Sequence, residues 1–541
     1  MVSRFLTLHH PAEARRFYER GVWRNETLYG LLANHATARP DAIALVDGSR
    51  RLTWRELQSW VDGVALDLRT YGLSEGDRVS IWMSNKVESI VTFLACAREG
   101  FACNPSLHRT YTCSEMAALL ERLSAKALVT EPRWGADWKT ANLDATLAGL
   151  QSLRVVYTPD TFPRPAPNMT PPCDDPDKVA YLAFTSGTTG HPKCVMHSDN
   201  TLLANARDLA RDWGHDADTV ILSLSPLSHH IAWVALAQWI LLGCRLVTDD
   251  PPAGKSRVDW ILENHATYVM GVPTHAMDIL ADQRTRGIPT LGDVNVFYMA
   301  GSPIPPSVAA AFVDQGVKPQ NVYGMTENSS HQYTHPDDET QTIISTCGCG
   351  GRAYEVRIFD PVDPDRELPR GEAGQIGGRG ACLMLGYFDN QAATEGSFNR
   401  GGWFMSGDLG VMDAAGNLRI DGRLKDLIIR GGHNIYPAQI EALALRNTAV
   451  KKVACFPVRD DRLGERVCIG VIGEVLADDL LHHLAKEGLS RFDMPEYFVR
   501  LDAFPLTASG KILKRELVHM VERGDIAPES VRFRAHEGAG S

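Results

Sequence analysis

The chain has 541 residues, a formal net charge of −11 and a hydrophobic content of 44%. It is longer than one hydrophobic core usually supports, so we expect two or more domains. The acidic excess is modest, with no long run of like charge and no polybasic patch, which argues against nucleic acid or an anionic membrane as the main partner.

The first residues contain no apolar core of signal-peptide length. The most apolar run, Ile231–Cys244, is too short to span a bilayer and contains Gln238. Eleven cysteines are scattered without the spacing of a disulfide framework, as is typical of a reducing compartment. Cys347 and Cys349 have no second Cys/His pair close in sequence, so a metal site is not favoured there. We therefore expect a cytoplasmic protein without a transmembrane segment.

Short β-branched or apolar runs alternate with longer amphipathic stretches, a pattern typical of α/β layers. This pattern predicts strands at 42–46 and 78–83 and helices at 53–71 and 87–98. The proline-rich segment 158–177 is expected to be an extended surface connection.

The segment Tyr181–Met196 (YLAFTSGTTGHPKCVM) begins as an apolar, strand-like run and breaks into a loop of small hydroxyl residues and glycines. Glycine lets the backbone turn so that N–H groups converge on an anion, hydroxyls add donors, and a lysine adds a cation. The spacing is not that of a Walker loop, because Cys194 follows the lysine. The loop is predicted to hold phosphates through Thr185, Ser186, Gly187, Thr188, Thr189, Gly190 and Lys193.

Four further motifs follow in chain order. They are Tyr323–Glu327 (YGMTE), Trp403–Asp408 (WFMSGD), Gly422–Asp426 (GRLKD) and Pro505–Lys511 (PLTASGK). With the phosphate loop, this ordered set resembles the adenylate-forming superfamily of acyl-CoA synthetases, peptide-synthetase adenylation domains and luciferases. The resemblance extends from about Leu28 to Val518. It implies an AMP-forming carboxylic acid–CoA ligase with ATP, Mg²⁺ and coenzyme A as cofactors.

The resemblance also implies a domain organisation. A large N-terminal α/β domain of several subdomains, residues 1–423, would bind AMP, and a small mobile α+β lid, residues 424–541, would carry the catalytic lysine. A break in composition at Gly422–Gly432 supports this boundary. Lys425 matches the hinge position of the family.

A carboxylate cannot condense directly with a thiol in water, so it must first gain a leaving group, and attack on the α-phosphate of ATP supplies one. Negative charge grows on the phosphoryl oxygens, so the site needs cations and donors there. By resemblance, Lys511 bridges the substrate carboxylate and the α-phosphate, Thr326 contacts that phosphate, and Glu327 binds Mg²⁺. His229 matches the aromatic gate of the carboxylate pocket.

The remaining nucleotide contacts are also implied by the resemblance, and each has a simple physical role. A glycine lets the backbone approach the base closely, and a carboxylate accepts hydrogen bonds from both ribose hydroxyls. The residues assigned are the stacking Tyr323 with the flexible Gly324, the adenine-binding turn at Gly301 and Ser302, and Asp408 and Arg423 at the ribose.

The acyl pocket is expected to be apolar and compact, with no charged side chain to bind a substrate amine or a second carboxylate. Its expected residues are Ile231, Ala232, Ala235 and His331. The stretch Ala12–Thr27 resembles an extension of ligases for cyclic and aromatic acids such as cyclohexanecarboxylate and dihydroxybenzoate. We therefore expect a cyclic, aromatic or medium-chain acid and a role in fatty acid metabolism.

The acyl acceptor is expected to be CoA, because Gly431 and Gly432 match the pantetheine tunnel of CoA ligases and the sequence contains no Gly-Gly-x-Ser carrier site. A stand-alone acyl- or aryl-AMP ligase that loads a carrier protein, a luciferase-type oxygenase and a non-catalytic nucleotide-binding regulator are the alternatives. A regulator is disfavoured because Lys511, Glu327 and Asp408 are all present, and a P-loop kinase because the Walker spacing is missing. The expected partners are the acid, ATP and CoA, with a homodimer left open.

Overall fold

The computed structural model describes residues 5–48, 50–185, 192–506 and 512–533. Internal contacts divide the chain into two compact units. Unit 1 is the described part of Met1–Val356 with Gly378–Phe398, and unit 2 is the described part of Arg357–Gly377 with Asn399–Ser541. The boundary predicted between residues 423 and 424 concerns a hinge, which is a property of movement, and it stays a prediction.

Unit 1 contains an eight-stranded sheet that is parallel except for an antiparallel strand at each edge. Parallel strands need helical crossovers, so both faces of such a sheet are covered. In spatial order the strands are β14 (Ser329–Tyr333), β13 (Lys318–Met325), β12 (Val296–Ala300), β11 (Tyr268–Gly271), β9 (Val220–Ser223), β10 (Arg245–Thr248), β1 (Ile43–Val46) and β2 (Arg51–Thr53).

A second sheet of unit 1 has six strands, of which only the edge strand β8 is antiparallel to its neighbour. In spatial order they are β6 (Val155–Tyr157), β5 (Ala127–Thr130), β3 (Arg78–Trp82), β4 (Ala102–Asn104), β7 (Val179–Thr185) and β8 (Lys193–Ser198). Phe184, at the end of β7, donates its backbone N–H to the Ser106 hydroxyl at 2.7 Å, so the chain after β4 is fixed beside β7.

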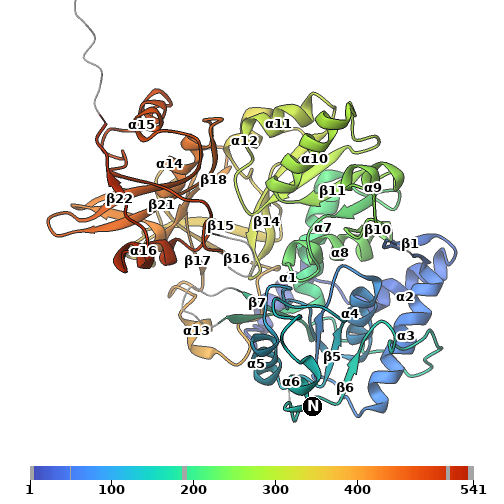
Figure 1. Cartoon of the computed structure of the whole chain (residues 1–541). Helices are drawn as coiled ribbons and strands as arrows, with labels where there is room; N and C mark the ends of the chain where they lie inside the picture. Colours follow the sequence, from blue (N-terminus) through green and yellow to red (C-terminus); the bar gives the residue numbers. More distant parts are fainter. Residues whose placement is uncertain (1–4, 49, 186–191, 507–511, 534–541) are drawn as a thin grey trace, which may run out of the picture. The chain divides into compact units, whose positions relative to one another are not determined.

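Unit 1 also contains helices, several of which lie on the faces of these two sheets (Figure 1). They are α1 (Pro11–Glu19), α2 (Leu28–Ala38), α3 (Trp54–Thr70), α4 (Val87–Glu99), α5 (Cys113–Leu123), α6 (Leu143–Ala148), α7 (Asp199–Trp213), α8 (His230–Leu242), α9 (Arg257–Glu263), α10 (Pro273–Arg286), α11 (Pro306–Val313), α12 (Thr340–Ser345) and α13 (Gln391–Glu395). The strands expected at 42–46 and 78–83 and the helices expected at 53–71 and 87–98 are confirmed as β1, β3, α3 and α4.

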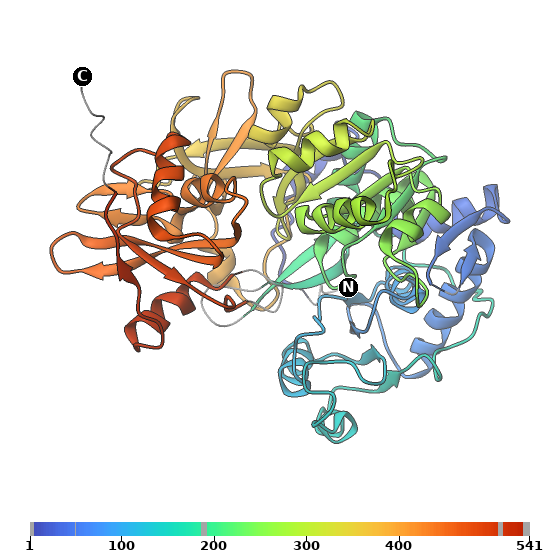
Figure 2. The same cartoon turned by 45° about the horizontal axis from the view of Figure 1, so that its top comes forward.

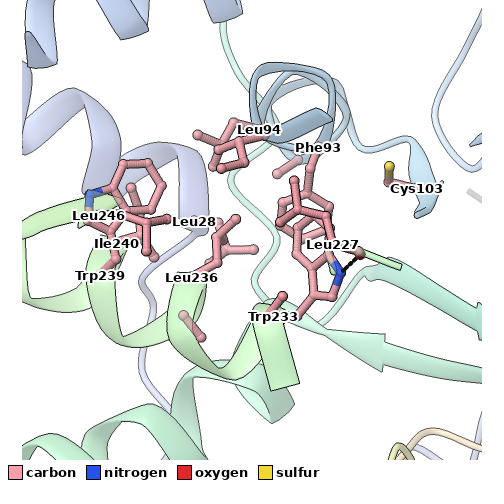
Figure 3. Close-up of a cluster of buried hydrophobic side chains, with 14 of the residues drawn as sticks. Leu28, Phe93, Leu94, Cys103, Leu227, Trp233, Leu236, Trp239, Ile240 and Leu246 are labelled. Carbon is pink, nitrogen blue, oxygen red and sulfur yellow. Dashed lines mark hydrogen bonds between the residues drawn. The ribbon is translucent and has the colours of Figure 1, made fainter. Parts of the chain in front are cut away.

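Helix α8 is central to the largest hydrophobic core, which joins residues of both sheets of unit 1. Figure 3 shows Trp233 and Trp239 of α8 packed among leucines and Phe93. Each indole N–H has a backbone partner, because Trp233 donates to the Leu227 carbonyl at 2.6 Å and Trp239 to the Ala44 carbonyl at 2.9 Å. The core therefore fixes the position of α8 and of the segment that precedes it.

Segment 158–177 contains no helix or strand and is largely exposed, as the sequence predicts. It is anchored at several points, one of which is the buried guanidinium of Arg98, which donates to the backbone carbonyls of Asn168 and Thr170 at 3.0 and 2.7 Å. Asp62 and Glu99 accept from the same guanidinium and balance its charge.

Unit 2 is built from two sheets with helices against the second one (Figure 2). The first sheet, which lies mainly in this unit, has the order β15 (Tyr354–Phe359), β16 (Ala373–Gly380), β17 (Phe404–Met412) and β18 (Leu418–Arg423). The second has the order β20 (His433–Ile435), β19 (Ile428–Arg430), β22 (Gly464–Gly473), β23 (Tyr497–Arg500) and β24 (Glu529–Ser530), with β21 (Val450–Asp460) also paired to β22. The helical elements are η1 (Leu424–Asp426), α14 (Pro437–Ala444), α15 (Ala477–Lys486) and α16 (Lys514–Glu522).

Candidate active site

The expected adenine-binding turn and Tyr323 meet at the carboxyl edge of the eight-stranded sheet. Strands β12 and β13 are parallel neighbours in which Ala300 pairs with Val322. Gly301 and Tyr323, one residue further along each strand, therefore lie beside each other. Gly301 adopts a φ of +90°, which favours glycine, and Gly301 and Ser302 are exposed. Ligands of α/β sheets bind at this kind of edge.

Thr326 and Glu327 lie in a tight turn between β13 and β14. Asn328 closes the turn twice, because its backbone N–H donates to the Met325 carbonyl at 3.2 Å and its side-chain oxygen accepts from the Met325 N–H at 3.0 Å. Gly324 is required there, because a Cβ at this position would lie 1.7 Å from the Ser329 carbonyl oxygen.

The carboxylate of Glu327 is held by a tyrosine that the sequence analysis did not single out. The Tyr387 hydroxyl donates to Glu327 Oε1 at 2.9 Å, and burial, followed by the nearby Glu327 charge, raises the pKa of this phenol. The backbone of Glu327 is fixed too, because its carbonyl accepts from the Met384 N–H at 2.7 Å. Lys193 Nζ lies 4.6 Å from the centre of the Tyr387 ring. Tyr387 thus links the expected phosphate lysine to the expected metal ligand.

The predicted phosphate loop connects the two strands of an antiparallel pair. Thr185 at the end of β7 pairs with Lys193 at the start of β8, and the Thr185 hydroxyl lies 3.4 Å from the Lys193 carbonyl. The loop therefore leaves and re-enters the same edge of the six-stranded sheet. Its residues Ser186, Gly187, Thr188, Thr189 and Gly190 lie outside the described residues.

His229 precedes helix α8 and is accompanied by a second histidine. The His108 ring lies 4.6 Å from the His229 ring, centre to centre, and His108 Nδ1 lies 3.0 Å from the Ser228 hydroxyl. Burial lowers the pKa of His108 to about 3, so its ring is neutral at pH 7. The expected gate is therefore packed against an uncharged ring.

The four expected pocket residues lie on two elements that contact each other, α8 and β14. Ala232 and Ala235 are fully buried, and Ile231 is partly buried at the start of the helix. His331 on β14 is 2% exposed, and its ring lies 4.2 Å from the Tyr354 ring, centre to centre, with the planes tilted by 34°. Neither ring nitrogen has a hydrogen-bond partner among the described residues. Burial lowers the pKa of His331 to about 3, so the ring is neutral. Among the four expected pocket residues, His331 is therefore the one polar group, and it is neutral.

Six expected site residues belong to unit 2, and five of them are described. Asp408 and Arg423 face each other across β17 and β18, with Asp408 Oδ1 3.4 Å from Arg423 Nε. Gly431 and Gly432 form the exposed turn between β19 and β20, and both have positive φ, +58° and +87°. Lys425 is exposed in η1. Lys511 lies outside the described residues.

Two family models match this chain. The model of the AMP-binding enzyme family covers residues 32–388, and the model of the AMP-binding enzyme C-terminal domain covers residues 439–511. The chain belongs to the AMP-binding enzyme family. The resemblance that the sequence motifs indicated is confirmed.

Named relatives of this AMP-binding enzyme include CoA ligases. A medium-chain fatty-acid–CoA ligase of Escherichia coli is 27% identical, with 94% of this chain and 93% of the relative covered. A 2-hydroxy-7-methoxy-5-methyl-1-naphthoate–CoA ligase of Streptomyces carzinostaticus is 29% identical, covering 93% and 95%.

Solved structures share the fold. The o-succinylbenzoate CoA synthetase MenE of Bacillus subtilis, in complex with its acyl-adenylate intermediate, superimposes with a TM-score of 0.80 at 26% identity, covering 90% of this chain and 97% of MenE. MenE has also been solved with ATP and magnesium. The predicted α/β fold with a large N-terminal and a smaller C-terminal part and the predicted class, a ligase that joins acids to CoA through an adenylate, are both confirmed.

Several contacting residues of this AMP-binding enzyme escaped the sequence analysis. Tyr387, His108, His197 and His230 reach the motifs through contacts between segments far apart in the chain. The two consecutive histidines, His229 and His230, were a sequence signal that could have identified His230.

Among the described helices, none has the length and apolarity needed to cross a membrane.

Tyr387→Phe tests the link between Glu327 and Lys193. The change removes the hydroxyl that donates to Glu327 and keeps the ring beneath Lys193. A hydrogen bond to a charged group contributes about 1.5–3 kcal/mol, so we expect roughly a 10- to 100-fold slower adenylate formation in a pyrophosphate-exchange assay.

Tyr18→Phe is the matched control, because Tyr18 also donates to a carboxylate, that of Asp177 at 3.0 Å, and is not a site residue. Exchange rates in Tyr387→Phe that equal those of the control would show that this hydroxyl does not support Glu327.

Proposed function

We propose that this enzyme joins a carboxylic acid to coenzyme A in two steps, forming an acyl-adenylate and pyrophosphate from ATP and then an acyl-CoA and AMP. One observation carries the proposal: the turn with Thr326 and Glu327 is held, through Tyr387, beside the lysine that ends the phosphate loop. A carboxylate and a cation are thereby set close to one sheet edge, as a reaction that moves polyphosphate charge requires.

The residues act mainly by placing charges and donors. Lys193 and the loop before it would neutralise the outer phosphates, and the Thr326 hydroxyl would donate to the α-phosphate. Lys511 would approach the same phosphate together with the substrate carboxylate, which lowers their mutual repulsion. Tyr323 and the Gly301–Ser302 turn would hold adenine, and Asp408 and Arg423 the ribose.

Glu327 fits the Mg²⁺ that this reaction uses. Magnesium typically takes one or two carboxylates, with phosphate oxygens and water completing an octahedron. The described residues contain no group of three or more His, Cys, Asp or Glu side chains placed to hold a metal alone, so a single carboxylate beside nucleotide phosphates matches a shared site. When bound, the ion would neutralise phosphate charge, and Glu327 would orient it.

CoA is the proposed acceptor. The exposed turn at Gly431 and Gly432 has positive φ at both residues, and a Cβ at Gly432 would meet no atom within 4 Å. Bare backbone of this kind suits a narrow passage for a pantetheine chain. The cytoplasmic location, the role in fatty acid metabolism and a homodimer stay predictions.

Product analysis with a panel of carboxylic acids tests the function. We expect AMP and pyrophosphate to appear only when an acid is supplied, and an acyl-CoA to appear only when CoA is added. ADP as the product would contradict adenylation. Acid-dependent pyrophosphate exchange without any acyl transfer to CoA would instead favour a ligase that loads a carrier protein.

The proposed substrate class rests on the four expected pocket residues, which are two alanines, an isoleucine and a neutral imidazole without a hydrogen-bond partner among the described residues. We propose a cyclic or aromatic acid with one uncharged hydrogen-bonding group, bonded to His331. A neutral ring offers one donor and one acceptor and attracts no second carboxylate. The hydroxyl in the name of the naphthoate ligase is a group of this kind.

His331→Phe tests this specificity. The change keeps an aromatic ring beside Tyr354 and removes both ring nitrogens. Because a hydrogen bond contributes about 1 kcal/mol net, we expect the kcat/KM ratio of a hydroxylated acid to its deoxy analogue to fall roughly fivefold. His215→Phe is the control, because His215 also stacks on a tyrosine, Tyr268, at 4.1 Å but is not a site residue. An unchanged ratio in His331→Phe would remove His331 from the acid pocket.

The predicted hinge makes the two half-reactions separable. Lys511→Ala should slow adenylate formation on the order of 10²–10³-fold and still transfer a supplied acyl-adenylate to CoA. Lys425→Pro, which restricts the backbone in η1, should do the opposite and accumulate adenylate. Equal loss of both half-reactions in both variants, with folding intact by circular dichroism, would contradict the predicted hinge at Lys425.

A further inference from the structure

The turn that carries Thr326 and Glu327 is contacted by two stacked histidines. His197 lies on β8 and His230 begins α8, and their rings lie 5.5 Å apart with planes at 22°. His197 reaches the Thr326 carbonyl, and His230 reaches the side chain of Ser329. The two histidines therefore hold the turn at two residues, Thr326 and Ser329.

The hydrogen-bond pattern fixes the tautomer of His197. Its Nε2 lies 2.6 Å from the Thr326 carbonyl oxygen, which can only accept, so Nε2 carries the proton. Nδ1 lies 3.0 Å from the Thr201 hydroxyl and accepts from it. Burial lowers the pKa of His197 to about 4, so the ring stays neutral at pH 7 and keeps this arrangement.

The other end of the turn is strained. Ser329 has a φ of +55°, a conformation that residues other than glycine rarely adopt. Its hydroxyl lies 3.0 Å from His230 Nε2, while His230 Nδ1 lies 3.2 Å from the Tyr181 hydroxyl on β7. Burial holds the pKa of His230 well below its usual value. A strained residue persists where its surroundings over-determine it, and the His230 bond is part of that constraint.

We propose that His197 and His230 form a positioning pair that sets the Met325–Ser329 turn for adenylate formation, with His197 fixing the Thr326 backbone directly. The inference rests on the proposed function. The pair also connects the turn with two other parts of the site. His197 lies on the same strand, β8, as Lys193, and His230 follows the gate residue His229. Neither ring needs to touch a substrate, so both act through the residues that they hold.

The decisive variants change only the donor at position 197. His197→Leu keeps much of the volume and leaves the Thr326 carbonyl without its partner, whereas His197→Gln returns an amide N–H near the position of Nε2. Since a misplacement of about 1 Å can cost about 100-fold, we expect His197→Leu to lower kcat for adenylate formation on the order of 10²-fold. KM for the acid should change by only about twofold, because none of the four proposed acid-pocket residues is removed.

Rescue and binding separate positioning from general damage. His197→Gln should recover kcat to within about fivefold of the unmodified enzyme, and His215→Leu, which removes another buried histidine, should leave kcat near that of the unmodified enzyme. Calorimetric titration with ATP, with and without Mg²⁺, gives a readout apart from turnover. The gain in ATP affinity from Mg²⁺ should shrink in His197→Leu and persist in His197→Gln.

The outcomes distinguish the two proposals. If the unmodified enzyme forms no adenylate with any acid, the proposed function fails, and the calorimetric comparison still tests the positioning pair. If the enzyme does form adenylate, then a His197→Leu variant with normal kcat and normal Mg²⁺-dependent ATP binding overturns the inference. So does a His197→Gln variant as impaired as His197→Leu, or a His215→Leu variant with the same losses.

Discussion

Neutral imidazole is the chemical constraint on which the site of this enzyme depends. In water a histidine is charged about half the time near pH 6.5, but burial penalises the charged form and lowers the pKa of His108, His197 and His331 to about 3 or 4. A neutral ring has one donor and one acceptor, so each nitrogen has a defined role. These buried rings add no charge that would compete with the lysines for a polyanion, and one of them, His197, orients the backbone at Thr326.

The fold supplies this burial by bringing two sheets together around one helix. Helix α8 lies in the core between them, fixed by indole hydrogen bonds to backbone at Leu227 and Ala44. Its first residue, His230, consequently stands where β7, β8 and the β13–β14 turn meet. Most of the helix is buried and apolar, and His230 at its N-terminus makes polar contacts with β7 and with the β13–β14 turn.

The sequence was sufficient for what depends on local pattern. The strand and helix near residues 78–98 follow from apolar periodicity, and the turn with Thr326 and Glu327 follows from a motif whose glycine the structure requires by a steric contact with Ser329. The residues that contact that motif could not be predicted from the sequence. His197 contacts Thr326 across 129 positions, and Tyr387 contacts Glu327 across 60, and such pairs depend on how two sheets pack. The acid pocket stays a prediction, and the burial of both ring nitrogens of His331 is a tertiary property that no local pattern indicates.

The unpartnered ring of His331 bears on how selectivity arises under the proposed function. A buried polar group without a partner costs about 1–3 kcal/mol, so a complex in which the His331 ring stays unbonded carries this cost. An acid with a matching hydroxyl or carbonyl removes the cost, while an acid without one leaves it in place. Discrimination then comes from the penalty in the complex with an acid that lacks the matching group. The satisfied rings of His197 and His230 have no such penalty to relieve, which is why their role is to hold the turn rather than to read the acid.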